Sequence, residues 1–300
     1  MGDPASTATP LIALASGVAV LAAALFAVST SVQHHAAETA PSSAGGVVGL
    51  VRHLLGRPTW LLGQFVGVLG LGLHAAALHY GRIAVVQPII ISGIIFAVPT
   101  RAAISRRLPS QAEIRAVALT GAGLAVFLVA SNPTAGTHIG IEMRAAVQVA
   151  VCVVIALAAA ATAWVTRQAD RRAFYLGVTA GVLFGLVAGL LKMVLQILAD
   201  EGATQVLLAW QTWLLVVFGV AGGVVNQLAY RSSRLSASMP VLNIVDGLVA
   251  LAFGYFVFHE IPRHSVLFLV IEVIAMSAVA VGLLLTARLE DEPLSPRRES

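Results

Sequence analysis

Three charged side chains stand inside long apolar stretches of this 300-residue chain, namely Lys192, Asp246 and Glu272. A charged side chain near the centre of a bilayer costs about 2.5 to 3.5 kcal/mol on insertion scales. If these stretches cross a membrane, each charge therefore needs a partner or a water-filled cavity. Carboxylates and ammonium groups in that setting can bind a solute or carry a proton. The three residues are the first candidates for chemistry.

The depth of the three charges indicates one shared cluster. Asp246 is close to the middle of its apolar stretch, and Lys192 and Glu272 are each roughly 5 to 10 Å nearer to one surface, at 1.5 Å per residue. We expect Asp246 to be the coupling or substrate-orienting carboxylate, and Lys192 to hold the neighbouring Glu272 ionised. The alternative is a static buried pair that only fixes helix packing.

Stripes of small and polar residues surround these charges. Glycines recur every fourth residue before Lys192, and Lys192 and Gln196 continue the same helical face. Similar stripes contain Asn243 and Asp246 in one later stretch and Asn226 in another. We expect the stripes to line a central cavity, but for the four glycines taken alone we expect close helix packing, which explains them without any substrate. These glycines are Gly177, Gly181, Gly185 and Gly189.

The stretches that carry these residues are long enough to cross a membrane. Hydrophobic residues make up 58% of the chain and charged residues 11%, whereas an ordinary soluble domain is about a quarter charged. A helix needs about 17 to 25 apolar residues to span the hydrocarbon core. The predicted fold is therefore all-α and polytopic, with nine transmembrane helices numbered in chain order. They are 10–32, 60–78, 83–99, 114–130, 145–165, 174–198, 206–229, 239–258 and 266–286.

The connectors between these helices differ strongly in positive charge. With nine spans the termini lie on opposite sides, so every connector belongs to one of two faces. Fourteen arginines fall on one face and three on the other, and the remaining basic residue is Lys192. By the positive-inside rule, we expect a cell-membrane protein with its N-terminus outside and its C-terminus in the cytoplasm. The cytoplasmic set is Arg52, Arg57, Arg101, Arg106, Arg107, Arg115, Arg167, Arg171, Arg172, Arg231, Arg234, Arg288, Arg297 and Arg298, and the outer set is Arg82, Arg144 and Arg263.

The two halves of the chain share several motifs. A Trp-Leu-Leu run starting at Trp60 precedes Pro88, much as one starting at Trp213 precedes Pro240. Leu25-Phe26 likewise matches Leu183-Phe184. Helices one to four thus recur as helices six to nine, and the offset of five spans turns the second copy upside down. Inverted repeats of this kind are common in secondary transporters.

This comparison predicts a 4+1+4 organisation. The first repeat covers residues 1–132 and includes a short cytoplasmic interfacial segment near 45–57. A linker transmembrane helix over 143–167 precedes the inverted second repeat over 173–287. A cytoplasmic tail over 288–300 ends the chain.

Two segments, Ala84-Val85-Val86-Gln87-Pro88 and residues 235–246 with the later Phe258-His259-Glu260, resemble a known family. This family is the drug/metabolite transporter superfamily, in its NIPA-like and EamA-like branch. Similar proteins have a proline after the aspartate, where this chain has Gly247, so a kink in helix eight stays an open question. The resemblance implies transport of a small solute or ion, with magnesium as the substrate in the NIPA branch. Mg²⁺ is usually bound through carboxylates, and the intramembrane acids here share the bilayer with Lys192, so we expect another main substrate.

The leading hypothesis is a secondary-active transporter that moves a small metabolite or ion by alternating access. Two alternatives stay open: a flippase for a lipid-linked metabolite, or its partner subunit, and a membrane scaffold that transports nothing. We expect no enzymatic activity, cofactor, metal site or nucleic-acid partner, because no phosphate-binding, zinc or triad motif is present. The expected partners are the bilayer and the substrate, and a homodimer stays open. Four histidines near span ends are expected to be interfacial polar groups: His34, His35, His74 and His79.

The predicted orientation can be tested by cysteine labelling in a variant whose only native cysteine, Cys152, is replaced. We expect single cysteines at Thr134 and Thr204 to react with an impermeant thiol reagent added outside intact cells. A cysteine at Ser105 should not react, because its connector belongs to the arginine-rich cytoplasmic face. The reverse labelling pattern would contradict the orientation.

Overall fold

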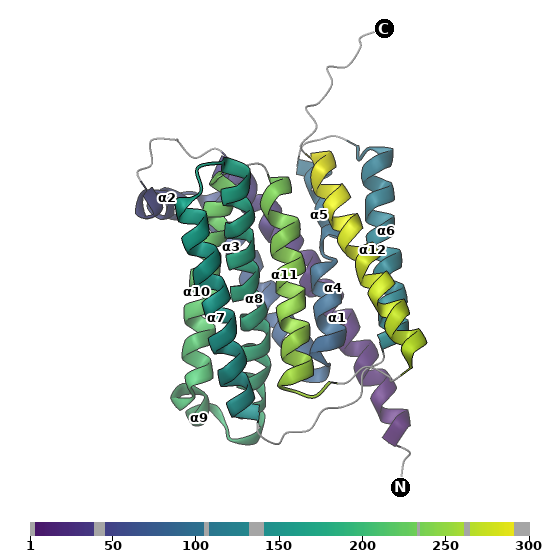
Figure 1. Ribbon diagram of the computed structural model, residues 1–300. Coiled ribbons are helices and arrows are strands. Elements are labelled where there is room, and N and C mark those ends of the chain that lie inside the picture. The colour runs from purple at the N-terminus through teal and green to yellow at the C-terminus, as the bar shows by residue number, and fades with distance from the viewer. Residues whose placement is uncertain are drawn as a thin grey trace.

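The computed structural model describes residues 4–38, 46–104, 108–131, 141–232, 235–260 and 265–290. Within these ranges every regular element is a helix, and the long helices run side by side in one bundle (Figure 1). Thr134, Ser105 and the end of the predicted tail lie outside the described residues. The helices are α1 (Pro4–Glu38), α2 (Gly46–Leu55), α3 (Pro58–Tyr80), α4 (Ile83–Ile91), α5 (Ile94–Ile104), α6 (Gln111–Ser131), α7 (Ile141–Val165), α8 (Ala169–Asp200), α9 (Ala203–Leu208), α10 (Trp210–Ser232), α11 (Leu235–Phe256) and α12 (Val266–Glu290).

The prediction of an all-α, multi-pass membrane protein is confirmed. Nine helical stretches among the described residues are long and apolar enough to cross a bilayer, one for each predicted span. They are Leu11–Gln33, Pro58–Tyr80, Ile83–Thr100, Gln111–Ala130, Ile141–Val165, Ala169–Asp200, Trp210–Ala229, Ser238–Phe256 and Val266–Thr286.

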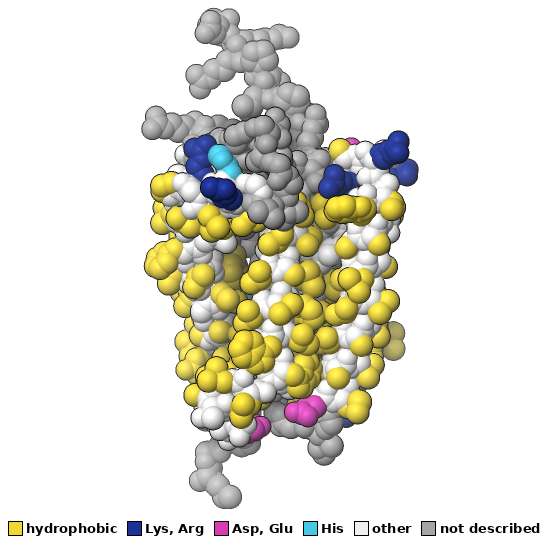
Figure 2. Space-filling view, turned by 90° about the vertical axis from the view of Figure 1, so that its left-hand side faces the viewer, with side chains coloured by type: hydrophobic (Ala, Val, Ile, Leu, Met, Phe, Trp, Pro, Cys, Tyr) yellow, Lys and Arg dark blue, Asp and Glu magenta, His cyan; other side chains and the backbone are white. Residues whose placement is uncertain are grey.

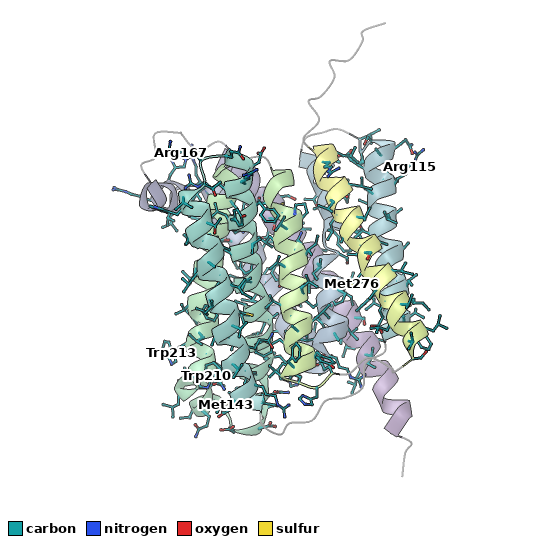
Figure 3. All side chains as sticks on the ribbon, in the orientation of Figure 1. Arg115, Met143, Arg167, Trp210, Trp213 and Met276 are labelled. Carbon is teal, nitrogen blue, oxygen red and sulfur yellow. The ribbon has the colours of Figure 1, made fainter. Side chains whose placement is uncertain are left out.

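The outer surface of the bundle is that of a protein surrounded by lipid. Figure 2 shows hydrophobic side chains over the middle of one face and basic side chains gathered mainly at the end that carries α2. Arg115 and Arg167 lie at this end, whereas Trp210 and Trp213 lie at the opposite end (Figure 3). Tryptophan rings prefer the headgroup region, so these positions fit helices that cross the membrane along the bundle axis.

The third span is broken, although the sequence predicts one continuous helix over residues 83–99. Pro88 has no N–H to donate to the preceding turn, and the helix ends soon after it at Ile91. The Ser92 hydroxyl donates to the Ile89 carbonyl at 2.7 Å, and the Gly93 N–H donates to the Ile90 carbonyl at 3.0 Å, so the chain tightens before α5 begins. A Cβ on Gly93 would lie 3.0 Å from the Ala23 carbonyl oxygen of α1. The break therefore lies where two backbones approach closely.

The helix packing links the early and late parts of the chain. In the first part, α1 packs on α3, α4 and α5, and α5 contacts α6. In the second part, α8 packs on α10 and α11, and α11 contacts α12. Between the parts, α4 packs on α11, α6 on α12, α3 on α8 and α1 on α10, while α7 packs mainly on α8. The most buried spans, α8 and the broken α4–α5 span, therefore have protein neighbours instead of lipid on most sides.

The predicted interfacial segment contains the short helix α2. Its Leu54 is buried against Ala36 of α1 and Trp60 of α3, whereas Arg52 and Leu55 are exposed. This distribution gives α2 one face against the bundle and another face toward its surroundings.

The α8 glycines provide a test of this packing. A Cβ on Gly181 would lie 2.6 Å from the Leu242 carbonyl oxygen of α11, a backbone atom that cannot rotate away. We expect Gly181→Ala to destabilise the protein by about 1 to 3 kcal/mol, measured as a lower melting temperature in detergent. Gly223→Ala on α10 is the matched control, because no atom lies within 4 Å of its Cβ position. Equal melting temperatures for the two variants would contradict this account.

Candidate functional site

The glycine stripe of α8 is filled by α11. Besides Gly181, a Cβ on Gly177 would lie 2.6 Å from the Ser238 carbonyl oxygen, and one on Gly185 would lie 2.7 Å from the Asp246 carbonyl oxygen. A Cβ on Gly189 would overlap the Phe253 ring. These four glycines therefore have the helix-packing role expected of them, and their side of α8 does not line a cavity. They allow two helix backbones to touch, which is the usual role of small residues spaced in this way.

Asp246 meets the broken span. Its Oδ1 accepts a hydrogen bond of 2.9 Å from Gln87 Nε2 of α4, and the Gln87 side chain is only 1% exposed. The two helices approach closely here, because a Cβ on Gly247 would overlap Ile91 Cδ1. Gly247 thus admits α4 without breaking α11, which is one helix from Leu235 to Phe256. Among the residues that the structure describes, one amide donor holds this carboxylate at the contact of α4 and α11.

The Gln87 amide also lies beside the imidazole of His74 in α3. His74 was expected to be an interfacial polar group, but its side chain is buried inside the bundle and meets the Phe26 ring edge-on, with centroids 6.1 Å apart. Asp246 and its partner Gln87 therefore lie where α3, α4, α8 and α11 meet. The sequence motif around Pro88 contains Gln87 but does not identify the partner of this side chain.

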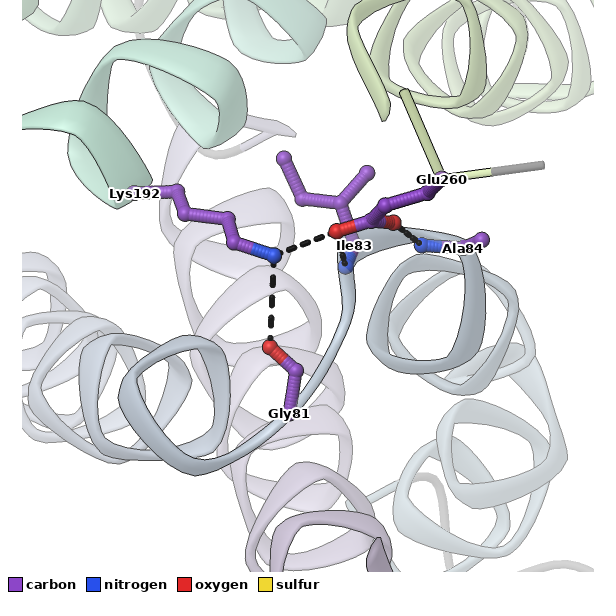
Figure 4. A network of polar contacts seen from close by, with 5 residues as sticks. All are labelled: Gly81, Ile83, Ala84, Lys192 and Glu260. Carbon is purple, nitrogen blue, oxygen red and sulfur yellow. Dashed lines mark hydrogen bonds and ion pairs between the residues drawn. The ribbon is translucent and has the colours of Figure 1, made fainter. Parts of the chain in front are cut away.

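Lys192 binds a different acid from the one predicted. Its Nζ pairs with Oε1 of Glu260, a residue that follows α11, and donates a hydrogen bond of 3.4 Å to the Gly81 carbonyl (Figure 4). The Nζ also lies 5.0 Å from the centre of the Phe258 ring. The side chains are 12% and 2% exposed for Lys192 and Glu260, so the pair is almost fully removed from solvent.

Glu260 also caps α4. The Ile83 N–H donates to Oε1 at 3.2 Å and the Ala84 N–H donates to Oε2 at 2.9 Å. These are first-turn amides without a partner inside the helix, and a carboxylate at that position also interacts favourably with the helix dipole. We call the cluster of Lys192, Glu260, Gly81, Ile83 and Ala84 the latch (Figure 4).

The chain turns locally so that Glu260 can reach α4. His259 adopts a left-handed conformation with φ of 52°, and the Glu260 N–H donates back to the Gly254 carbonyl at 2.9 Å. Arg144 of α7 hydrogen-bonds the His259 ring at 2.7 Å. A Cβ on Gly254 would lie 3.1 Å from Glu260 Oε2, so a glycine there leaves room for the carboxylate.

Glu272 does not pair with Lys192, and the predicted ion pair between them was wrong. The Glu272 side chain lies on α12 and is 6% exposed, and its Oε1 receives no hydrogen bond from the described residues. Equal depth was the reason for expecting the pair, but Lys192 is on α8, which packs on α7, α10 and α11. The three intramembrane charges thus have three different environments.

The remaining candidates are partly buried. Asn243 lies one turn before Asp246 on α11, Gln196 one turn after Lys192 on α8, and Asn226 on α10. Next to Asn226, Gln227 donates to Gln33 of α1 at 2.9 Å, and Gln33 donates to Ser29 at 2.8 Å. This polar chain joins α10 to α1, and the sequence offered no indication of its pairing.

Comparison with known proteins leaves the family open. No family model and no solved structure matches this chain. A similar protein of Corynebacterium glutamicum, described as uncharacterised, is 24% identical over 251 residues, which are 83% of this chain and 84% of that protein. The similarity covers most of both chains, and it names no activity.

The latch gives a stability prediction. We expect Lys192→Met to destabilise the protein by about 3 to 5 kcal/mol, because it leaves the Glu260 carboxylate buried without a cation. The double variant Lys192→Met/Glu260→Gln should recover part of this loss, and Arg171→Met, which removes an exposed cation, should have little effect. Melting temperatures of the purified variants check this, and a harmless Lys192→Met would contradict it.

Proposed function

We propose that this chain is a secondary-active transporter that moves a small metabolite or ion across the cell membrane by alternating access. The observation that carries the proposal is the position of Asp246. Its carboxylate lies near the middle of α11, is hydrogen-bonded to Gln87 of a broken span, and has no cation beside it among the described residues. Transporters commonly place substrate and coupling-ion sites on discontinuous helices near the bilayer midplane.

The packing pattern supports the inverted repeat. Exchanging α1 with α8, α3 with α10, the α4–α5 span with α11, and α6 with α12 leaves the main packed pairs unchanged. Thus α1–α3 corresponds to α8–α10, and α3–α8 corresponds to α10–α1. The pairs α4–α11 and α6–α12 map onto themselves, as expected of helices beside a two-fold axis. The helix α7 has no counterpart, which fits the role of a linker helix.

A local contact supports the same correspondence. A Cβ on Gly70 of α3 would lie 3.0 Å from the Phe26 ring of α1, and a Cβ on Gly222 of α10 would lie 3.0 Å from the Phe184 ring of α8. Phe26 and Phe184 belong to the motifs that match between the two halves of the sequence. The 4+1+4 organisation and the membership of the drug/metabolite transporter superfamily are part of this proposal.

The proposal places the α2 end of the bundle in the cytoplasm. Arg52, Arg57, Arg115, Arg167 and Arg288 lie at that end and are exposed, which is the distribution that the positive-inside rule associates with the cytoplasm. The C-terminal end of α12 is then cytoplasmic, and the turns after α3 and α11 face outward.

The substrate can be sought by a broad ligand screen on the purified protein. A ligand that binds the folded state raises the melting temperature to an extent set by its affinity and concentration. Hits are then tested for uptake into proteoliposomes. Stabilisation only by solutes with a polyprenyl tail would identify a flippase, and a protein that binds and moves no solute would be a scaffold.

The role of Asp246 gives the central prediction. Asp246→Asn keeps an Oδ1 acceptor for Gln87 but cannot change its charge, so we expect coupled uptake to fall to the level of empty vesicles. Folding and membrane insertion should stay nearly intact, measured by melting temperature and yield. Glu142→Gln, at the exposed start of α7, is the matched control and should transport normally.

Normal uptake by Asp246→Asn would show that the carboxylate has no part in coupling. Loss of uptake because the variant fails to fold would show that its role is structural. Magnesium uptake that requires Asp246 would contradict the expectation of another main substrate.

A further inference from the structure

The latch connects the two proposed halves of the transporter at one end of the bundle. Glu260 and Lys192 belong to the second half, with α8 and α11, whereas Gly81, Ile83 and Ala84 belong to the first half. Three contacts therefore cross between the halves: the two amide hydrogen bonds to Glu260, and the hydrogen bond from Lys192 to the Gly81 carbonyl (Figure 4). The ion pair between Lys192 and Glu260 lies within the second half.

We propose that Glu260 is the gate residue at this end of the bundle, and that Lys192 is the residue that positions it. In the state seen here, the Glu260 carboxylate closes this end by capping α4. In the opposite state, the second half withdraws with Lys192 and Glu260 still paired, and the amides of Ile83 and Ala84 are released. This assignment rests on the proposed transport function. It makes Glu260 the residue that controls access to the Asp246 site from this end.

The short helix α4 connects the gate to the candidate coupling site. Its first residues bind Glu260, and Gln87, one turn later, binds Asp246. Residues four apart lie on the same face of a helix, so Ile83 and Gln87 both face the second half. Since α4 is separated from α5 by the break at Ser92 and Gly93, it can tilt without moving the whole span. A change at Asp246, by a proton or a solute, is therefore transmitted to Glu260 through one rigid turn.

The strength of the gate depends on its nearly dry surroundings. Each hydrogen bond to Glu260 involves a charged acceptor, and such bonds are about twice as strong as neutral ones. When these hydrogen bonds break, water must take over as the hydrogen-bond partner of Glu260 and of the two amides, and water enters only when this end opens. The contact thus favours one of two discrete arrangements, as a gate requires.

The other end of the proposed repeat carries a different charge. Glu260-Ile261-Pro262 corresponds in the repeat to Arg107-Leu108-Pro109, so an arginine stands where the gate carboxylate would be. An arginine cannot accept hydrogen bonds from helix amides. The proposed repeat therefore does not carry this carboxylate over from the second copy to the first.

The gate can be tested by the accessibility of a reporter cysteine. In a Cys152→Ala background, Asn243→Cys places a thiol on the face of α11 that continues Gly247 and Gly254, which contact α4. An impermeant maleimide is added to intact cells and, separately, to inverted membrane vesicles. Thr204→Cys on exposed α9 identifies which preparation presents the Glu260 end to the reagent.

We expect Glu260→Gln to raise the labelling rate of the reporter about tenfold from the Glu260 end, since the amide is a weaker cap and does not pair with Lys192. Glu142→Gln, which removes an exposed carboxylate elsewhere, should leave the labelling rate unchanged. The charge-swapped variant Lys192→Glu/Glu260→Lys should label like Glu260→Gln, because a lysine cannot cap α4.

Three outcomes would overturn the assignment. Unchanged labelling in Glu260→Gln would mean that this contact does not control access. Restored protection in the charge-swapped variant would mean that an ion pair alone closes this end. Failure of both Glu260→Gln and Glu260→Asp to fold would make the latch a structural element. A parent protein that transports no solute would defeat the proposed function without changing the labelling result, so the two failures are distinguishable.

Discussion

The arrangement of the helices depends most on the hydrogen bonds that the buried Glu260 carboxylate accepts from the first amides of α4. A helix that begins inside a membrane protein needs acceptors for its first amides, because no bulk water is available to replace them. Glu260 supplies two acceptors for α4, and Lys192 balances its charge. Since α4 is only a short half-span, its position is set by these contacts at one end and by Gln87 further along. Without this cap, a helix that begins at Ile83 would leave the buried Ile83 and Ala84 N–H groups without hydrogen-bond acceptors.

The α8–α11 interface provides the rigid frame for this arrangement. Four glycines allow the two backbones to touch, so α8 and α11 hold Lys192 and Glu260 on one body. The broken span α4–α5, by contrast, meets α11 along a shorter contact that contains Gly247 and Ile91. The contact of α4 with α11 is thus the lighter of these two, although the halves also pack closely along α6 and α12, so α4 is the element that can move most easily relative to α11.

The sequence predicted the positions of the membrane-spanning helices well because that information is local. Span length and hydrophobicity are properties of continuous segments, and the nine predicted spans follow from them. The partners of Lys192, by contrast, lie far from it in the sequence. Depth alone favoured Glu272, but Glu260 reaches Lys192 because the chain reverses at His259 and points back toward α4. Glu260 lay beyond the predicted end of helix eight and was treated as a connector residue, although it belongs to a segment that carries the family resemblance. The break in the third span was also missed, because its Ser92-Gly93 signal is compatible with an apolar helix.

The two acids that contact α4 lie in different environments, which suit different tasks in the proposed mechanism. Glu260 has two backbone amides and an ammonium group around it, so nearly all of its interactions favour a fixed carboxylate. Asp246 has one neutral amide donor and no cation beside it among the described residues, so fewer contacts hold its carboxylate in place. A group that must gain and lose a proton or a bound solute needs an environment like that of Asp246. A group that must hold a helix end needs an environment like that of Glu260. Because α4 contacts both acids within two turns, a change at Asp246 would, in the proposed mechanism, act on the helix whose first turn Glu260 caps.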